Sequence, residues 1–316
     1  MSGFGYRIED GQAERVPLRH ILRCEAPLIW AHLTATTEHA QAWLRDEARL
    51  ESYVVDALTA TETRPRCDAL QAGALVNLRG RSEDAPDTGD VLASVRVWAT
   101  EGRVFSVARR HLVAMDQVEA MVRAGEVGDP GDLIAAFATA ITADLDPVVA
   151  DLGDALDDAE EQISADNIFA LRREVTRVRV AALGYRRFIH PQRAALEKLA
   201  ALPGDWLQED DRLHLAAAAD RAARMAEELE SIRERSAVMH ETLTDLRAEQ
   251  IDARSLVLSA AALIFLPLTF ITGLYGMNVK GLPGAESPWA FDVIVLACLV
   301  IAAAVIGWFA LRWFRR

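Results

Sequence analysis

Two long stretches without a charged side chain lie at the C-terminal end of the chain, and they constrain its fold more than any other feature. The first covers residues 255–275 and the second covers residues 293–311. A helix of 21 residues spans roughly 31 Å, about the thickness of the hydrocarbon core of a bilayer. Soluble proteins rarely bury helices that stay apolar over this length, which disfavours two core helices. The sequence therefore predicts a C-terminal membrane hairpin.

Basic residues flank this hairpin on one side only. Arg247 and Arg254 precede the first stretch and Arg312, Arg315 and Arg316 follow the second, whereas residues 276–292 carry one lysine and no arginine. Positive residues stay in the cytoplasm, so both termini are expected inside and the connecting loop outside. The three C-terminal arginines would either form an inner basic ring or simply anchor the helix.

Composition excludes several classes of function. The chain has 47 acidic and 34 basic residues and a formal net charge of -13, which disfavours nucleic acid as a partner. Its three cysteines are far apart and form no metal-binding pair, as suits a reducing compartment. Walker A, GxGxxG, GxSxG and zincin motifs are missing, so we expect no enzyme. Without a nucleotide site, transport would be channel-like or driven by an ion gradient.

The N-terminal third of the chain reads as α/β, and the rest is helical in pattern. Strands are expected at residues 28–33, 74–78, 92–98 and 103–108, helices at 38–50 and 50–58, and a surface loop at 80–89. Two helical arms of opposite charge follow, acidic over residues 144–166 and arginine-rich over residues 172–193. They would either neutralise each other as an antiparallel pair or present an acidic face that attracts cations.

A heptad pattern follows the break at residues 202–204. Its 4-3 spacing connects Met225, Leu229, Ile232, Ser236, Met239, Leu243, Leu246 and Gln250. No glycine or proline separates this seam from residue 255, which predicts one helix from about residue 206 to 275, roughly 100 Å long. The seam would join subunits in a bundle, or it would pack against its own domain.

The same spacing inside the first apolar stretch selects mostly small or hydroxylated residues. These are Ser255, Ser259, Ala262, Leu266, Thr269 and Gly273. Such a stripe serves either close helix packing in lipid or the lining of a pore. In a pore, Leu266 would be the one bulky constriction, able to gate by dewetting.

The first apolar stretch ends in Tyr275-Gly276-Met277-Asn278. A Gly-Met-Asn tripeptide at the outer end of the first of two C-terminal spans resembles the signature of the CorA family of divalent-cation transporters. Residues 62–67, 77–80 and 95–98, together with the loop 276–284, make the chain most similar to the ZntB-type zinc transporters. The resemblance implies an α+β cytoplasmic domain, a long stalk helix continuing into a two-helix transmembrane hairpin, and a homopentameric funnel.

Asn278 is the first strong hydrogen-bonding side chain after the stripe. Its uncharged carbonyl would bind the water shell of a hydrated divalent cation without trapping it, and a symmetric set would form a collar at the entrance. Gly276 would permit a close backbone approach, and Met277 is expected to pack against neighbouring helices. Lys280 does not suit an entrance that concentrates cations, because its positive charge would repel them. Glu286 lies two residues beyond the Pro283-Gly284 pair.

Zinc ligands are sparse in the rest of the sequence. The seven histidines show no HxxxH or HExxH spacing. Asp210 and His214 lie four residues apart on one helix face and are weak candidates, more typical of a solvated surface.

These observations and the resemblance divide the chain into five parts. We expect a cytoplasmic domain at 1–204 with arms at about 131–200, a stalk at 205–254, a pore-lining helix at 255–275, an outer loop at 276–291, and a second membrane helix at 292–313. The expected function is transport of divalent cations, most of all Zn2+, across a bacterial-type inner membrane, with no permanently bound cofactor. The expected partners are further copies of the chain, the lipid bilayer and the cations themselves. The alternatives are a CorA-type Mg2+/Co2+ channel and a membrane-tethered coiled-coil scaffold, which would leave the tripeptide unexplained.

Overall fold

The computed structural model describes residues 2–34, 38–61, 64–70, 73–82, 92–164, 167–204, 206–277, 281–284 and 287–313. They form two units. The first contains residues 1–163 and 169–240, and the second contains residues 164–168 and 241–316. Each unit is described by itself.

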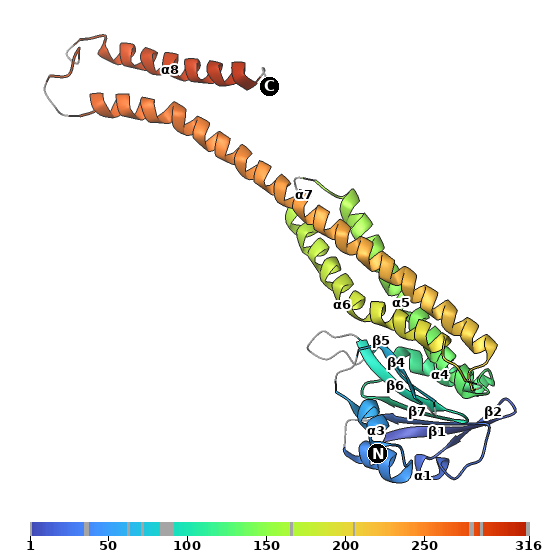
Figure 1. The fold of residues 1–316 in the computed structure, drawn as a ribbon. Helices are drawn as coiled ribbons and strands as arrows, with labels where there is room; N and C mark the ends of the chain where they lie inside the picture. Colours follow the sequence, from blue (N-terminus) through green and yellow to red (C-terminus); the bar gives the residue numbers. More distant parts are fainter. Residues whose placement is uncertain are drawn as a thin grey trace. The chain divides into compact units, whose positions relative to one another are not determined.

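A seven-stranded sheet forms the base of the first unit (Figure 1). Its order is β2-β1-β3-β7-β6-β5-β4, and only the β3–β7 pair is parallel. The strands are β1 (Ser2–Glu9), β2 (Gln12–Val16), β3 (Leu28–Thr34), β4 (Arg66–Leu70), β5 (Gly73–Arg81), β6 (Leu92–Thr100) and β7 (Arg103–Ala108). The four strands expected from the sequence are confirmed, whereas β1, β2 and β4 were not foreseen. The expected loop at 80–89 is partly wrong, because Gly80 and Arg81 belong to β5 and residues 83–89 lie outside the described part.

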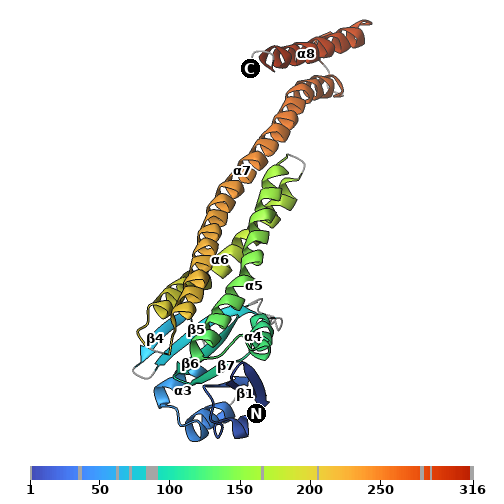
Figure 2. The ribbon, with the colours of Figure 1, turned by 90° about the vertical axis from the view of Figure 1, so that its right-hand side faces the viewer.

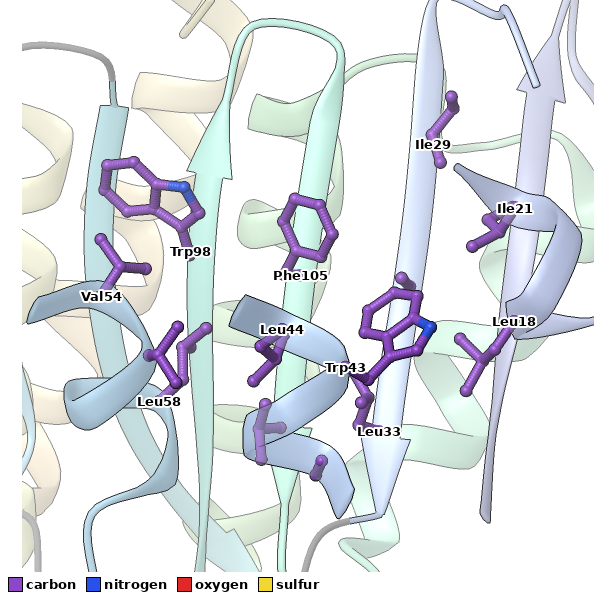
Figure 3. Packing of buried hydrophobic residues seen from close by; sticks show 14 of the residues in the cluster. Leu18, Ile21, Ile29, Leu33, Trp43, Leu44, Val54, Leu58, Trp98 and Phe105 are labelled. Atoms are coloured by element: carbon purple, nitrogen blue, oxygen red, sulfur yellow. The ribbon is translucent and has the colours of Figure 1, made fainter. Parts of the chain in front are cut away.

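Short helices cover one face of this sheet. They are α1 (Leu18–Ile21), α2 (Glu38–Ala42), a π-helical turn (Trp43–Glu47) and α3 (Ser52–Thr59). Figure 3 shows the cluster they bury, in which Trp43 and Leu44 pack over Phe105. The opposite face also buries large side chains, because Trp30 of β3 meets Phe137 edge to face with ring centres 5.7 Å apart. A strand that is buried on both faces reads as a continuous apolar run, which is why residues 28–33 were recognisable.

Five longer helices follow the sheet. They are α4 (Val113–Ala124), α5 (Pro130–Glu161), α6 (Ile168–Ala200), α7 (Glu209–Tyr275) and α8 (Ala290–Trp313). In the first unit, α5, α6 and the early part of α7 run side by side (Figures 1 and 2). The single helix expected from about residue 206 to 275 is confirmed by α7.

The heptad seam of α7 is buried within its own chain. Met225, Leu229, Ile232, Ser236 and Met239 are all at most 3% exposed. Part of their cover comes from α5, where a Cβ placed on Gly153 would lie 4.0 Å from Cδ1 of Ile232. The interpretation of this seam as a contact between subunits is therefore wrong over these residues, because helices of the same chain already occupy that face.

The two charged arms pair with α7 and the sheet instead of with each other. Asp144 on the acidic arm binds Arg81 of β5 at 2.6 Å, and Glu160 binds Arg235 of α7 at 2.8 Å. On the basic arm, Arg186 binds Glu230 of α7 at 2.6 Å. Among the residues that the structure describes, no ion pair joins the arms directly. Mutual neutralisation is therefore wrong as an account of these charges, and α7 supplies much of the compensation.

Three helices in the described part of the chain are long and apolar enough to cross a membrane. The apolar window of α5 is 67% buried within the protein, whereas the windows of α7 and α8 are 0% and 6% buried. A helix buried by its own domain needs no lipid, so α5 is a core helix. Only α7 and α8 expose their apolar surface in the way that a membrane-spanning helix does.

Candidate functional site

The end of α7 and the loop after it contain the tripeptide identified in the sequence. The amide of Gly276 donates to Thr272 O at 2.9 Å and that of Met277 to Leu274 O at 3.4 Å, so helical hydrogen bonding continues past Tyr275. Gly276 and Met277 are exposed. Asn278, Lys280 and Glu286 lie outside the described residues, as do Arg315 and Arg316 of the proposed basic ring. Arg312 lies in the last turn of α8.

Residues 281–284, the described segment after the tripeptide, contact the end of α7 through Pro283. The Tyr275 hydroxyl donates to the backbone oxygen of Pro283 at 3.2 Å. Gly281 and Gly284 adopt φ angles of 100° and 72°, where a side chain would be strained. The Tyr275 hydrogen bond holds Pro283 close to the C-terminus of α7.

The stripe lies on a single exposed face of α7. Ser255, Ser259, Ala262, Leu266, Thr269 and Gly273 are all exposed, with Leu266 at 68%. Phe265, Leu266, Thr269 and Phe270 line a shallow hollow of about 360 Å³ at the middle of the stripe. No acidic side chain lies along it, so the face could pass a hydrated ion without binding it tightly.

The second helix of this unit meets a different face of α7. A hollow of about 570 Å³ between α7 and α8 is lined by Leu268, Thr272 and Tyr275 on one side and by Phe291 and Cys298 on the other. The Thr272 hydroxyl donates to Leu268 O at 3.0 Å, which satisfies it within the helix. Because α8 uses this face, the stripe is left open to other molecules.

The weak zinc candidates are not brought together with further ligands among the described residues. Asp210 and His214 are both exposed. Their neighbour Asp211 is instead fully buried, and its carboxylate lies within 4.8 Å of those of Asp129 and Asp132. Sequence reasoning missed this trio because Asp211 is distant in sequence from the other two, although an acidic residue at the start of a helix is a capping signal.

The acidic trio forms caps for two helix N-termini. Asp129 accepts from the amide of Asp132 at 3.0 Å, Asp132 from that of Gly128 at 2.8 Å, and Asp211 from that of Gln208 at 2.7 Å. Burial and the neighbouring carboxylates raise the pKa of Asp211 to about 7. Each carboxylate is thus engaged by backbone N–H groups, and the trio is a shared cap that anchors α5 and α7.

Comparisons with known proteins agree with this architecture. The family described as CorA-like Mg2+ transporter protein matches residues 25–316. The zinc transport protein ZntB of Pectobacterium atrosepticum is 30% identical over 95% of this chain and 92% of its own. The divalent cation transporter CmaX of Pseudomonas aeruginosa is 34% identical over 91% of this chain and 87% of its own.

Solved structures extend the similarity to the whole fold. The full-length CmaX structure superposes with a TM-score of 0.79 at 31% identity, covering 99% of this chain and 98% of that one. The CorA magnesium transporter of Methanocaldococcus jannaschii gives the same TM-score at 16% identity, covering 98% of each chain, and shares the fold. With a family match over most of its length and relatives at 30% identity or more, this chain belongs to the CorA family.

Proposed function

We propose that the cation carried by this CorA-family divalent-cation transporter is Zn2+. The observation that carries this proposal is similarity over 95% of the chain to a protein named for zinc transport. The soluble-domain sequences and the loop after Met277 point the same way. A CorA-type Mg2+/Co2+ channel is the second candidate, favoured by the family description.

The proposed path for the cation follows the stripe of α7 in a homo-oligomer, with a pentamer expected from the family. All six stripe residues lie on a face that α8 does not cover. Closing that face around an axis would surround the path with small and hydroxylated side chains and leave Leu266 as the constriction. Asn278, positioned by Gly276 and Met277, would form the collar at the outer end.

The proposed membrane topology places residues 255–275 and 292–313 as the two spans of an inner-membrane protein. The exposed apolar windows of α7 and α8 support it. Both termini would be cytoplasmic, with the three C-terminal arginines at the inner surface and residues 276–291 outside. Residues 1–204 would then form the cytoplasmic domain and 205–254 the stalk.

Uptake by proteoliposomes tests the choice of cation. Zn2+ and Mg2+ would be offered at equal concentration, with and without a pH gradient, to vesicles that contain the purified protein. We expect saturable Zn2+ uptake that exceeds Mg2+ uptake, and loss of uptake in Asn278→Ala. Mg2+ uptake equal to or faster than Zn2+ uptake would assign the protein to the second candidate.

Native mass measurement of the detergent-solubilised protein tests the assembly. A pentamer with bound lipid is expected. A monomer that still transports Zn2+ would contradict a path formed at a symmetry axis.

A further inference from the structure

An arginine-rich pocket of about 460 Å³ lies in the first unit, at a distance in sequence from the cation path. Its lining includes six arginines, namely Arg64, Arg79, Arg96, Arg109, Arg110 and Arg187. They come from the segment before β4, from β5, from β6, from the segment that follows β7 and from α6. No acidic side chain from the described part of the chain lines this pocket. Such a local excess of positive charge is unexpected in a chain with a net charge of -13.

Strand register explains how the arginines meet. Arg96 of β6 lies opposite Asn77 of β5, and Ser94 lies opposite Arg79. Side chains opposite each other share a face, and residues two apart on a strand share it too, so all four project from the same side of the sheet. The remaining arginines reach this side from the segments around it.

Arg96 is the most unusual member of the pocket because it is buried with two of its three guanidinium nitrogens unpaired among the described residues. It is 3% exposed, and neither its Nε nor its Nη1 has a hydrogen-bond partner among the described residues. Burial, together with the charges of Arg109 and Arg79, lowers the pKa of Arg96 to about 10. A buried cation without a counter-charge is costly, so this position carries a free-energy penalty that a bound anion would relieve.

Carbonyl oxygens and an aromatic ring contact two of the other guanidinium groups. Arg79 donates to Leu92 O at 2.7 Å and lies 3.8 Å from the centre of the Phe188 ring. Arg109 donates to Thr59 O at 3.0 Å. Arg64, Arg96, Arg109 and Arg187 form no ion pair with any described residue. These four guanidinium groups therefore keep their positive charge within the described part of the chain, and the contacts of Arg79 and Arg109 pre-organise the pocket.

We propose that this pocket binds the phosphate groups of a small molecule. The planar fork of a guanidinium matches the oxygen atoms of phosphate in a bidentate arrangement, and several forks around one cavity suit a multivalent oxyanion. The volume lies within the range of small-molecule sites and exceeds what a single phosphate needs, which favours a polyphosphate or a nucleotide. A bound phosphate would bridge α6 to β5 and β6, so its occupancy stabilises the first unit. The site is independent of the cation that the protein transports.

Binding to the full-length protein in detergent tests the proposal. Inorganic phosphate, pyrophosphate and ATP would each be titrated by calorimetry in a phosphate-free buffer with EDTA at fixed ionic strength, and the melting temperature would be followed in parallel. We expect saturable binding of pyrophosphate and a rise in melting temperature. Equal affinities for pyrophosphate and ATP would assign recognition to the phosphates alone, whereas tighter ATP binding would assign a nucleotide.

Variants separate this site from general electrostatic attraction. Arg96→Met removes the buried guanidinium charge but keeps an unbranched stem that matches arginine as far as Nε, so affinity should fall at least tenfold while the unliganded protein melts no lower than the parent. Arg103→Met removes an exposed arginine outside the pocket and should leave affinity unchanged. If Arg96→Met fails to fold, Arg109→Gln, at an exposed position, provides the same test.

Two results would overturn the proposal. One is the absence of saturable binding of all three compounds at about 10 mM. The other is an equal loss of affinity in Arg96→Met and Arg103→Met, which would reduce the binding to non-specific attraction.

Discussion

The two halves of α7 carry the same 4-3 spacing and use it in opposite ways. From Met225 to Met239 the spaced residues are buried and, apart from Ser236, large, whereas from Ser255 to Gly273 they are exposed and mostly small. The spacing thus determines which side chains share a helix face, but not what covers that face. In the first half the cover comes from the same chain, and in the second half the described chain leaves the face open. Oligomerisation should therefore depend on the stripe and not on the seam.

Alanine substitution of one leucine in each half of α7 gives the largest expected difference, measured as the loss of unfolding free energy. Leu229→Ala creates a cavity at a fully buried position and should lower the stability of the first unit by about 2–5 kcal/mol. Leu266→Ala truncates a side chain that is 68% exposed and should leave that stability unchanged. Denaturant unfolding followed by the fluorescence of Trp30 and Trp98, both buried in the first unit, measures the two effects. A Leu229→Ala protein of parental stability that has lost its oligomeric state would restore the seam as a subunit contact.

The N-terminus of α7 provides a pH-dependent test of how firmly the first half is anchored. Because the pKa of Asp211 is about 7 in the folded protein and lower when unfolded, the folded state binds more protons between these values. The free energy of unfolding should therefore fall as pH rises from about 4 to about 7. The fall is at most about 4 kcal/mol, because the folded pKa lies about three units above the ordinary value for an aspartate. Asp211→Asn keeps an acceptor for the Gln208 amide and removes the charge, so it should flatten this dependence and stabilise the protein at pH 8.

Unfolding midpoints of parent and Asp211→Asn at pH 5, 6, 7 and 8 provide the measurement. Zn2+ added at pH 8 separates a cap from a metal site. A Zn2+-dependent rise in the midpoint of the parent that disappears in the variant would contradict our assignment of Asp129, Asp132 and Asp211 as a cap.

At the other end of α7, the entrance should be sensitive to loss of a neutral amide. Asn278→Ala removes one carbonyl from every subunit at once, so Zn2+ uptake should fall at least tenfold while the oligomer stays intact. Met277→Leu next to it keeps the apolar volume that positions Asn278, so uptake should fall much less than in Asn278→Ala. Parental uptake by well-folded Asn278→Ala oligomers would show that the tripeptide does not form the collar.

The sequence predicted those elements whose burial pattern is strong and local. Strands β3, β5, β6 and β7 are buried over most of their length, and α7 and α8 carry long apolar runs. β2 and β4 were not predicted because they lie at the two edges of the sheet. The exposure pattern of β2, for example, includes no fully buried residue. An edge strand needs only one partner, so its residues carry less of the apolar alternation that reveals a strand.

The candidate sites also differ in whether their residues are local in sequence. The tripeptide and the stripe are contiguous or periodic in sequence, so they were found there. The arginine pocket combines residues from Arg64 to Arg187, and the acidic trio combines Asp129 with Asp211. These sets exist only after the sheet register and the helix packing bring them together. The ion-pair partners of the charged arms were missed for the same reason, since local charge runs do not specify which helix will supply the opposite charge.

The smallest expected effect concerns Lys280, the one basic residue in the loop beyond the stripe. Lys280→Ala removes one positive charge per subunit near the proposed entrance, so apparent affinity for Zn2+ should rise a few-fold at low ionic strength. Because the Debye length shortens from about 30 Å at 0.01 M salt to about 8 Å at 0.15 M, this gain should shrink as salt is added.

Lys198→Ala removes the same charge from an exposed position of α6 in the first unit and should show no such gain. The loss in Asn278→Ala acts through short-range contacts and should persist at both salt concentrations, so initial uptake rates in 0.01 M and 0.15 M salt separate the two residues. Identical affinities for Lys280→Ala and the parent at low salt would place the Lys280 charge away from the cation path.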